Sequence, residues 1–113
     1  MLIKKKESIR IENSSVCIAY GYEFKDKDIN VAPIEIRGRY PESGYVINEL
    51  VKEMFFVSFG NGKVVIENET FEINQGDMIF ILPKKKYLIE GNIDLIVSCS
   101  PAWSPEQHKH IDE

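Results

Sequence analysis

The sequence has few cysteines and histidines and no long hydrophobic run. Cys17 and Cys99 are its only cysteines; they lie far apart and without a metal-type spacing. No apolar stretch approaches the roughly 18 residues that a membrane-spanning helix needs, so a membrane protein is not expected. The N-terminal lysines are not followed by the apolar segment of a secretory signal. Because no export signal is found, we interpret both cysteines as reduced thiols. This combination predicts a cytoplasmic protein.

Charge and composition argue against two further classes of protein. The formal net charge is -4 and the pI is about 5.2, which gives the wrong overall field for a nucleic-acid binder. Hydrophobic residues make up 43% of the chain, and its six Phe, five Tyr and one Trp exclude a disordered chain. A length of 113 residues fits one domain with one core.

Alternation of apolar and polar residues dominates the chain. This period of two, together with short runs of β-branched and aromatic residues, is typical of strands. Such segments occupy residues 8–12, 32–37, 64–66, 71–73, 78–82 and 95–99. Many short strands at regular intervals predict an all-β sandwich or barrel.

Turn signals separate these segments. Asn61-Gly62 favours a tight hairpin because both residues tolerate positive φ. Further reversals are expected at Asn68, Gly76-Asp77 and Gly91-Asn92. The polar residues 23–30 are expected to form an exposed loop, and the first seven residues a solvated edge strand or a frayed tail.

Two segments resemble the conserved motifs of the cupin family. The first begins at Gly38-Arg39-Tyr40-Pro41 and continues through Glu53 to Gly60 and Gly62. The second begins at Gly76-Asp77, continues to Pro83 and is followed by Lys84-Lys85-Lys86-Tyr87. Residues 99–108 resemble the tail of small single-domain bacterial and archaeal cupins. The resemblance covers about residues 30–110.

The resemblance implies a double-stranded β-helix, the RmlC-like jelly-roll barrel of two facing antiparallel sheets, with a ligand or metal at its mouth. It implies one domain over residues 1–113, with an N-terminal strand or arm at about 1–12, the barrel at about 13–100 and a C-terminal strap at 101–113. Helical spacing of the apolar residues between 44 and 56 favours a helix instead, and the resemblance overrules that interpretation.

The metal ligands of the family are largely missing from this sequence. Metal-binding cupins supply two histidines and a glutamate from the first motif and a third histidine from the second. Glu53 falls on the glutamate position, whereas Asn48 and Glu49 stand near the first two histidine positions and Tyr87 at the third. Transition metals prefer imidazole donors, while Mg²⁺ or Ca²⁺ could accept Glu49, Glu53 and Asn48. No metal cofactor is predicted, with Glu49 and Glu53 as weak candidates for ligands.

By analogy with family positions, Tyr40, Asn48, Glu53 and Tyr87 converge at the barrel mouth. Such a pocket suits a small polar ligand, either sugar-like or a hydroxy acid. The alternative is that both tyrosines are core aromatics with satisfied hydroxyls, Glu53 bonds to backbone or solvent, and Asn48 is a turn residue.

The C-terminal strap carries the chain's two histidines, His108 and His110, and its one tryptophan, Trp103. If the strap crosses the mouth, Trp103, Gln107 and His108 become ligand contacts. The favoured alternative is that Trp103 plugs the barrel edge and both histidines are exposed. Cys99, at the end of an apolar segment, is expected to be a buried, inert thiol.

The leading functional prediction is a small-molecule-binding or sensing domain. One alternative is a metal-independent sugar isomerase or epimerase in which Tyr87 and Glu53 share proton transfer, so catalytic activity stays open. Another alternative is a purely structural barrel, which predicts that no cavity exists.

A homodimer is also expected. The segments 8–12 and 31–37 have suitable edges, and Ile9, Ile11, Ile34 and Ile36 need burial. A two-fold partner would cover them, with the N-terminal strand exchanged or paired across the interface.

Overall fold

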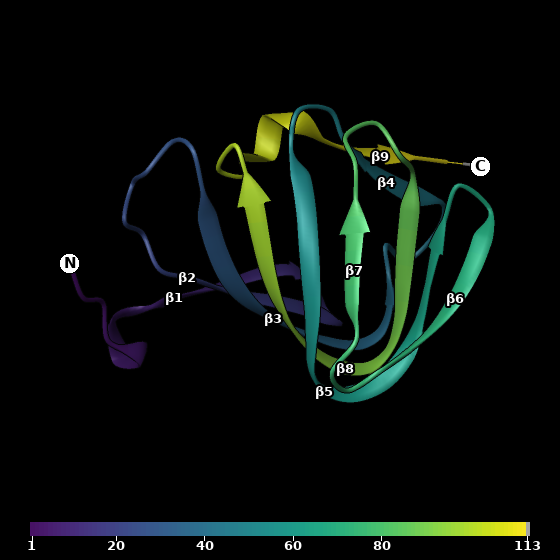
Figure 1. Cartoon of the computed structure of the whole chain (residues 1–113), viewed down its shortest axis with the longest axis horizontal. Helices are drawn as coiled ribbons and strands as arrows, with labels where there is room; N and C mark the ends of the chain where they lie inside the picture. Colours follow the sequence, from purple (N-terminus) through teal and green to yellow (C-terminus); the bar gives the residue numbers. More distant parts are fainter. Residues whose placement is uncertain (113) are drawn as a thin grey trace.

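The computed structural model describes residues 1–112 and forms a curled, almost entirely β structure (Figure 1). Its strands are Ile9–Ser14 (β1), Cys17–Gly21 (β2), Asn30–Tyr40 (β3), Tyr45–Asn48 (β4), Lys52–Ile66 (β5), Glu69–Asn74 (β6), Met78–Ile81 (β7), Tyr87–Ser100 (β8) and His108–Ile111 (β9). Two single-turn 3₁₀ helices span Lys5–Glu7 and Pro105–Gln107. The described residues contain no α-helix, so the all-β prediction is confirmed and the helical alternative for residues 44–56 is wrong. No helix within residues 1–112 is long and apolar enough to cross a membrane.

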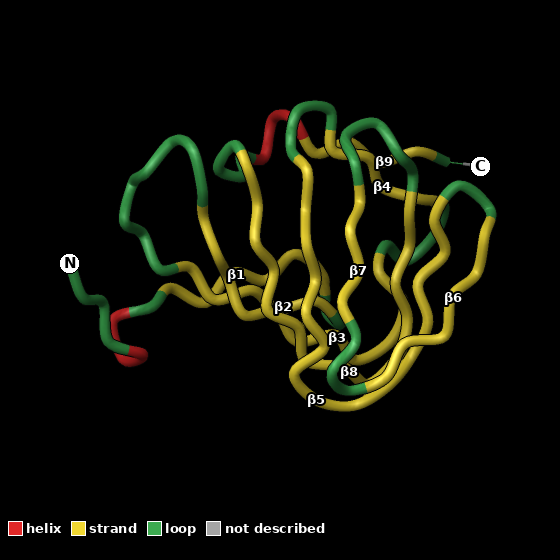
Figure 2. The backbone as a smooth tube through the Cα atoms, viewed as in Figure 1, coloured by secondary structure: helices red, strands yellow, loops and turns green. Residues whose placement is uncertain are grey.

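The long strands β5 and β8 form the centre of the sheet. They pair antiparallel from Lys52 opposite Ser100 to Ile66 opposite Tyr87. On its other side β8 pairs with β3, followed by β2 and β1. β7 and β6 pair with successive parts of β5, and β4 joins β8 to β9. The strands curl around a central space, and the segments between them stay short apart from the loop after β2 (Figure 2).

A row of glycines bends this sheet. Gly91 in β8 lies opposite Gly38 in β3 and opposite Gly62 in β5. A Cβ on Gly91 would lie 2.6 Å from the carbonyl oxygen of Asn61, so the backbones approach too closely for a side chain. The turns predicted at Asn61-Gly62 and Gly91-Asn92 are therefore wrong, because both pairs lie inside long, bent strands.

The tight hairpin lies further along the chain. Glu67 and Asn68 connect β5 to β6 with φ values of 49° and 71°, the positive pair that a two-residue hairpin requires. The turns predicted at Asn68 and at Gly76-Asp77 are confirmed, the latter connecting β6 to β7. All six predicted strand segments coincide with strands, whereas β2, β4 and β9 were not predicted.

Alternation along each strand decides which side chains form the core. On β5, Glu53, Phe55 and Val57 point inward and are buried, while Met54 and Phe56 point outward and are exposed. Inward residues of β3 and β8, including Ile36, Ile93 and Leu95, complete the packed part of the interior.

Candidate ligand-binding site

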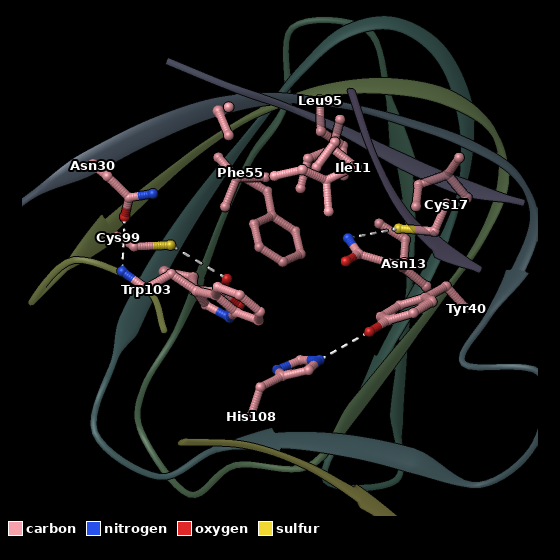
Figure 3. Close-up of a pocket in the computed structure, with 18 of the residues that line it drawn as sticks. Ile11, Asn13, Cys17, Asn30, Tyr40, Phe55, Leu95, Cys99, Trp103 and His108 are labelled. Carbon is pink, nitrogen blue, oxygen red and sulfur yellow. Dashed lines mark hydrogen bonds between the residues drawn. The ribbon is translucent and has the colours of Figure 1, made fainter. Parts of the chain in front are cut away.

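A cavity of about 140 Å³ lies inside the curled sheet (Figure 3). It is bounded by β1, β2, β3, β5 and β8 and by two residues of the C-terminal segment, Trp103 and His108. Most of the wall is apolar, with Ile34, Phe55 and Leu95 among its side chains. This volume is similar to that of cavities that hold a single six-membered ring. The filled interior expected of a purely structural barrel is therefore not observed.

Glu53 provides the buried carboxyl group of the cavity. Its Oε1 accepts hydrogen bonds from the Tyr87 hydroxyl at 2.9 Å and from Asn48 Nδ2 at 2.8 Å. Among the described residues, its Oε2 receives only the Cys99 thiol, at 3.4 Å, and a thiol is a weak donor. Burial raises the pKa of Glu53, while the hydrogen bonds from Tyr87, Cys99 and Asn48 oppose that rise. Oε2 is thus the carboxyl atom with hydrogen-bonding capacity left for a ligand.

Tyr87 holds this carboxyl in place. The side chain is buried, and its ring packs edge-on against Phe55 with ring centroids 5.8 Å apart. Burial, followed by the nearby charge of Glu53, raises the pKa of Tyr87 well above its ordinary value. The phenol therefore stays protonated and donates a hydrogen bond to Glu53 Oε1. Tyr87 lines the cavity, but its hydroxyl is committed to Glu53.

Asn48 connects Glu53 to His108. Asn48 and His108 are cross-strand partners of β4 and β9. The Asn48 Oδ1 accepts from Gln107 Nε2 at 2.9 Å and lies 2.8 Å from His108 Nδ1. Because a carbonyl oxygen can only accept, His108 carries its hydrogen on Nδ1. Asn48 does not line the cavity; it is a buried strand residue, and the turn role expected for it is wrong.

His108 is therefore a neutral ring with one free acceptor. Burial lowers its pKa, which favours the uncharged form. With the hydrogen on Nδ1, Nε2 accepts the Tyr40 hydroxyl at 2.9 Å. The Tyr40 and His108 rings are almost parallel, with an interplanar angle of 6°. A continuous hydrogen-bonded chain runs from Tyr40 through His108 and Asn48 to Glu53.

The C-terminal segment borders the cavity. The Trp103 ring centroid lies 5.4 Å from that of His108, and the Trp103 amide donates to Asn30 Oδ1 at 2.8 Å. In Figure 3 the rings of Trp103, His108 and Tyr40 border the cavity one after another. The prediction that both histidines are exposed is wrong for His108, which is half-buried; His110 is exposed and contacts the Ser43 carbonyl.

Gln107 is buried beside the site without lining the cavity. Its Oε1 accepts from the backbone amides of Leu50 and Val51 at 3.2 and 3.3 Å, while its Nε2 fixes the Asn48 carbonyl. The side chain predicted as a ligand contact therefore positions Asn48 and the segment before β5.

The donor set does not fit the metal centre that metal-binding relatives of the fold contain. Glu49, one of the two weak candidates, is exposed and does not line the cavity. Around Glu53, the Asn48 amide and the Tyr87 hydroxyl are already engaged in hydrogen bonds. Residues 1–112 contain no group of three or more His, Cys, Asp or Glu side chains placed to hold a metal ion.

Sequence reasoning missed part of the wall. Cys17 and Asn13, whose Nδ2 lies 3.8 Å from the Cys17 sulfur, line the cavity from β1 and β2. Burial raises the pKa of Cys17 to about 11 and raises that of Cys99 further, so neither thiol is activated as a nucleophile. Cys17, Ile18 and Ala19 are buried in succession, so β2 does not alternate, and the apolar run of residues 16–20 was the signal that could have located it.

Comparison with solved structures identifies the fold. A variant of Pac13 from Streptomyces, solved with uridine, superimposes with a TM-score of 0.90 at 18% identity, covering 99% of this chain and 90% of that one. Ectoine synthase from P. lautus superimposes with a TM-score of 0.74 at 17% identity, covering 98% of this chain and 90% of the enzyme. A third neighbour is the cupin domain of Cnp3 from Schizosaccharomyces pombe, with a TM-score of 0.67 at 12% identity over 75% of this chain and 64% of that one. This chain has the cupin fold.

No protein-family model matches this sequence. An uncharacterised protein of Methanocaldococcus jannaschii is 35% identical over 63 residues, which are 54% of this chain and 50% of that protein. The chain thus spans about half the length of the curated relative it matches. The jelly-roll fold implied by the two sequence motifs is confirmed.

Proposed function

We propose that this cupin binds a small, neutral, sugar-like molecule in the cavity above Glu53. The observation that carries the proposal is a mostly apolar cavity with hydrogen-bonding groups at two places, the Glu53 carboxyl and the Tyr40–His108 pair. Apolar walls with a few fixed polar groups are typical of small-molecule sites, since the walls bind ring faces and the polar groups select hydroxyls.

The charges around the cavity favour a neutral ligand over a hydroxy acid. Among the described residues, no Lys or Arg lines the cavity, and burial keeps His108 neutral by lowering its pKa. The carboxylate of a hydroxy acid would lose its hydration without gaining a cationic partner, and it would face the Glu53 carboxyl. A hydroxyl group meets neither penalty.

The size of the cavity favours one sugar ring. A volume of about 140 Å³ accommodates a single ring, and a larger ligand would have to extend past Trp103. Pac13, described as a nucleoside dehydratase, binds uridine in a variant structure of the same fold. A pentose ring inside the cavity with a substituent beside Trp103 is the arrangement we propose.

Trp103 makes binding directly measurable, because it is the one tryptophan of the chain and lines the cavity. We expect its fluorescence to respond saturably to uridine and D-ribose, with dissociation constants of about 1 mM or below, as for ligands of about ten to seventeen non-hydrogen atoms. D-ribonate has the same carbon skeleton with a carboxylate and is expected to give no saturable response. Preference for ribonate, or no response to either neutral probe, would contradict the proposal.

Two neighbouring substitutions on β3 separate the cavity from the rest of the barrel. Ala32 lines the cavity and Val31 points outward on the same strand. Ala32→Leu fills cavity space and is expected to weaken ribose or uridine binding at least tenfold, a loss of about 1.4 kcal/mol. Val31→Leu serves as the matched control and should leave the dissociation constant unchanged. Equal binding by both variants would place the ligand elsewhere.

A second candidate function is proton transfer on the same ligand, as in a sugar isomerase or epimerase. It is favoured by two groups with opposite roles: Glu53, a carboxyl whose raised pKa lets it hold a proton, and His108, an uncharged imidazole that can accept one at Nε2. Tyr87 would position Glu53 rather than share the transfer, because its hydroxyl is committed to Oε1. If this function holds, the protein in D₂O exchanges a C–H of bound ribose for deuterium, and Glu53→Gln abolishes the exchange while retaining binding.

A further inference from the structure

The outer surface of the sheet carries a continuous apolar area. Val31, Met54, Phe56, Met78 and Phe80 are 44%, 48%, 39%, 61% and 50% exposed, and we call them the outer apolar face. Met54 lies opposite Phe80, and Phe56 opposite Met78, on the paired strands β5 and β7. β7 and the adjacent part of β5 lie toward the viewer in Figure 1.

The face continues across β8 to β3. Met54 is paired with Ser98, which is paired with Val31. Phe56 is paired with Ile96, which is paired with Pro33. Two uncharged rows of side chains therefore cross four adjacent strands.

The size of this face is large for a monomer. A half-exposed Phe or Met presents about 100 Å², so the five residues together present about 500 Å², near the upper limit for a patch on a monomeric protein. With the polar residues around it, the face approaches the roughly 800 Å² that each partner buries in a stable interface.

The charges at the two ends of the face have opposite signs. Lys52 is exposed at the start of β5, one outward position before Met54. At the other end, Glu35 and Asp94 are paired on β3 and β8, and Arg37 forms an ion pair with Asp94 at 2.8 Å. One end is therefore basic, and the other keeps a net negative charge.

We propose that a second copy of this chain covers the outer apolar face, related by a two-fold axis that lies between the two sheets and runs across the strands. This rotation reverses the strand direction of the partner. The apolar rows then face each other, and β5 of each copy lies over β5 of the other with its direction reversed. Lys52 of each copy then lies one strand away, about 4.8 Å to the side, from Asp94 of the partner subunit. Because the charge pattern is complementary to its own reversed copy, it identifies a second copy as the partner. The dimer is formed face to face by two sheets rather than by the edge of β1.

The decisive measurement is the mass in solution by size exclusion with light scattering at about 100 μM. At this concentration even a dimer with a micromolar dissociation constant is mostly formed. The expected mass is twice the 13.0 kDa of the chain. Phe56→Glu combined with Met78→Glu places carboxylates in the centre of the face and should give the mass of one chain. Leu2→Glu combined with Phe24→Glu is the matched control at exposed apolar residues outside the face and should stay dimeric.

Three outcomes would overturn the proposal. The first is a wild-type mass of one chain at 100 μM. The second is a dimer that survives Phe56→Glu with Met78→Glu in protein whose circular dichroism is unchanged. The third is a dimer lost in Ile9→Glu but kept in the outer-face variant, since that result would place the interface on β1.

A single charge reversal tests the orientation and does not disturb the apolar residues. Lys52→Glu puts a carboxylate one strand away from Asp94 of the partner subunit and is expected to weaken the dimer about fivefold at low salt, the size of an exposed charge pair. Added salt should relieve this loss by screening. An unchanged dissociation constant would exclude the reversed arrangement of the two sheets.

Discussion

The two sides of β5 differ in an unusual way. The side facing the interior carries the carboxyl group of Glu53 next to Phe55, whereas the side facing outward carries Met54 and Phe56. A strand with one buried side normally shows the opposite distribution of polar and apolar residues. A buried polar group and an exposed apolar area are the informative departures from that rule, because each has a cost that the fold itself does not require.

The two departures point to two different kinds of interaction. Glu53 lines the cavity; its Oε1 accepts two hydrogen bonds, while its Oε2 accepts only a weak one from the Cys99 thiol. This free hydrogen-bonding capacity points to a small ligand. Met54 and Phe56 belong to the exposed outer apolar face, which points to another macromolecule. One strand thus serves a ligand on one side and a proposed partner on the other.

The sharpest way to test this difference is to truncate two neighbouring phenylalanines. Phe55→Ala removes a buried ring and is expected to lower the free energy of unfolding by about 3 kcal/mol. Phe56→Ala removes an outward ring and should cost less than about 1 kcal/mol at low protein concentration. Urea unfolding measured at about 1 μM compares them, and equal losses would mean that β5 does not alternate as described.

The next largest effect is expected at Asn48. Asn48→Ala leaves His108 Nδ1 without its acceptor, removes one of the two acceptors of Gln107 Nε2, and removes one of the two donors to Glu53 Oε1. Unsatisfied buried polar groups cost free energy, so the variant should lose about 2 kcal/mol of stability. Asn92→Ala, on the exposed side of β8, is the matched control and should lose less than about 0.5 kcal/mol. Similar losses from both would show that the network does not support the fold.

A third prediction concerns the hydrogen position on His108. Asn48→Asp replaces the carbonyl by a carboxylate, which stabilises the protonated ring and should raise the pKa of His108. Nitrogen NMR of the wild-type protein should show hydrogen on Nδ1 and none on Nε2 at neutral pH. Hydrogen on Nε2 instead would break the chain from Tyr40 to Glu53.

The smallest effect is the pH dependence of stability that Glu53 causes. Burial raises the folded-state pKa of Glu53 above its ordinary value of 4.5, so the folded protein holds this proton more tightly than the unfolded chain. The resulting stabilisation is full below pH 4.5 and is lost as the pH rises through the folded-state pKa. Glu53→Gln keeps the shape of the side chain but cannot ionise, so the variant does not lose stability as the pH rises. Its free energy of unfolding relative to wild type should therefore rise between pH 4.5 and the folded-state pKa of Glu53. A constant difference at every pH would mean that Glu53 ionises as it does in the unfolded chain.

Local patterns predicted the strands better than the turns. Alternation located β1 and β3, because the direction of each side chain depends only on its place in an extended chain, and short runs of β-branched and aromatic residues located β6 and β7. Asn61-Gly62 has the composition of a hairpin, yet it lies within β5 because Gly62 stands opposite Gly91. Only the register of two distant strands shows that these glycines make a bend.

The candidate site was predicted unevenly. Resemblance to cupins brought Tyr40, Glu53 and Tyr87 together, and all three line the cavity. It assigned Asn48 a contact that the structure does not show, and the chosen alternative left His108 exposed. The C-terminal segment could not be placed from its own residues, because its position depends on how β9 pairs with β4.

The sequence by itself determined that the chain is built of strands, because a period of two is a local property of the backbone. The tertiary structure alone decided that Asn48 meets His108, that Glu53 lines a cavity and that the apolar residues of four strands join into one outer face. These contacts depend on strand register, and a shift of one residue would turn every side chain to the opposite side.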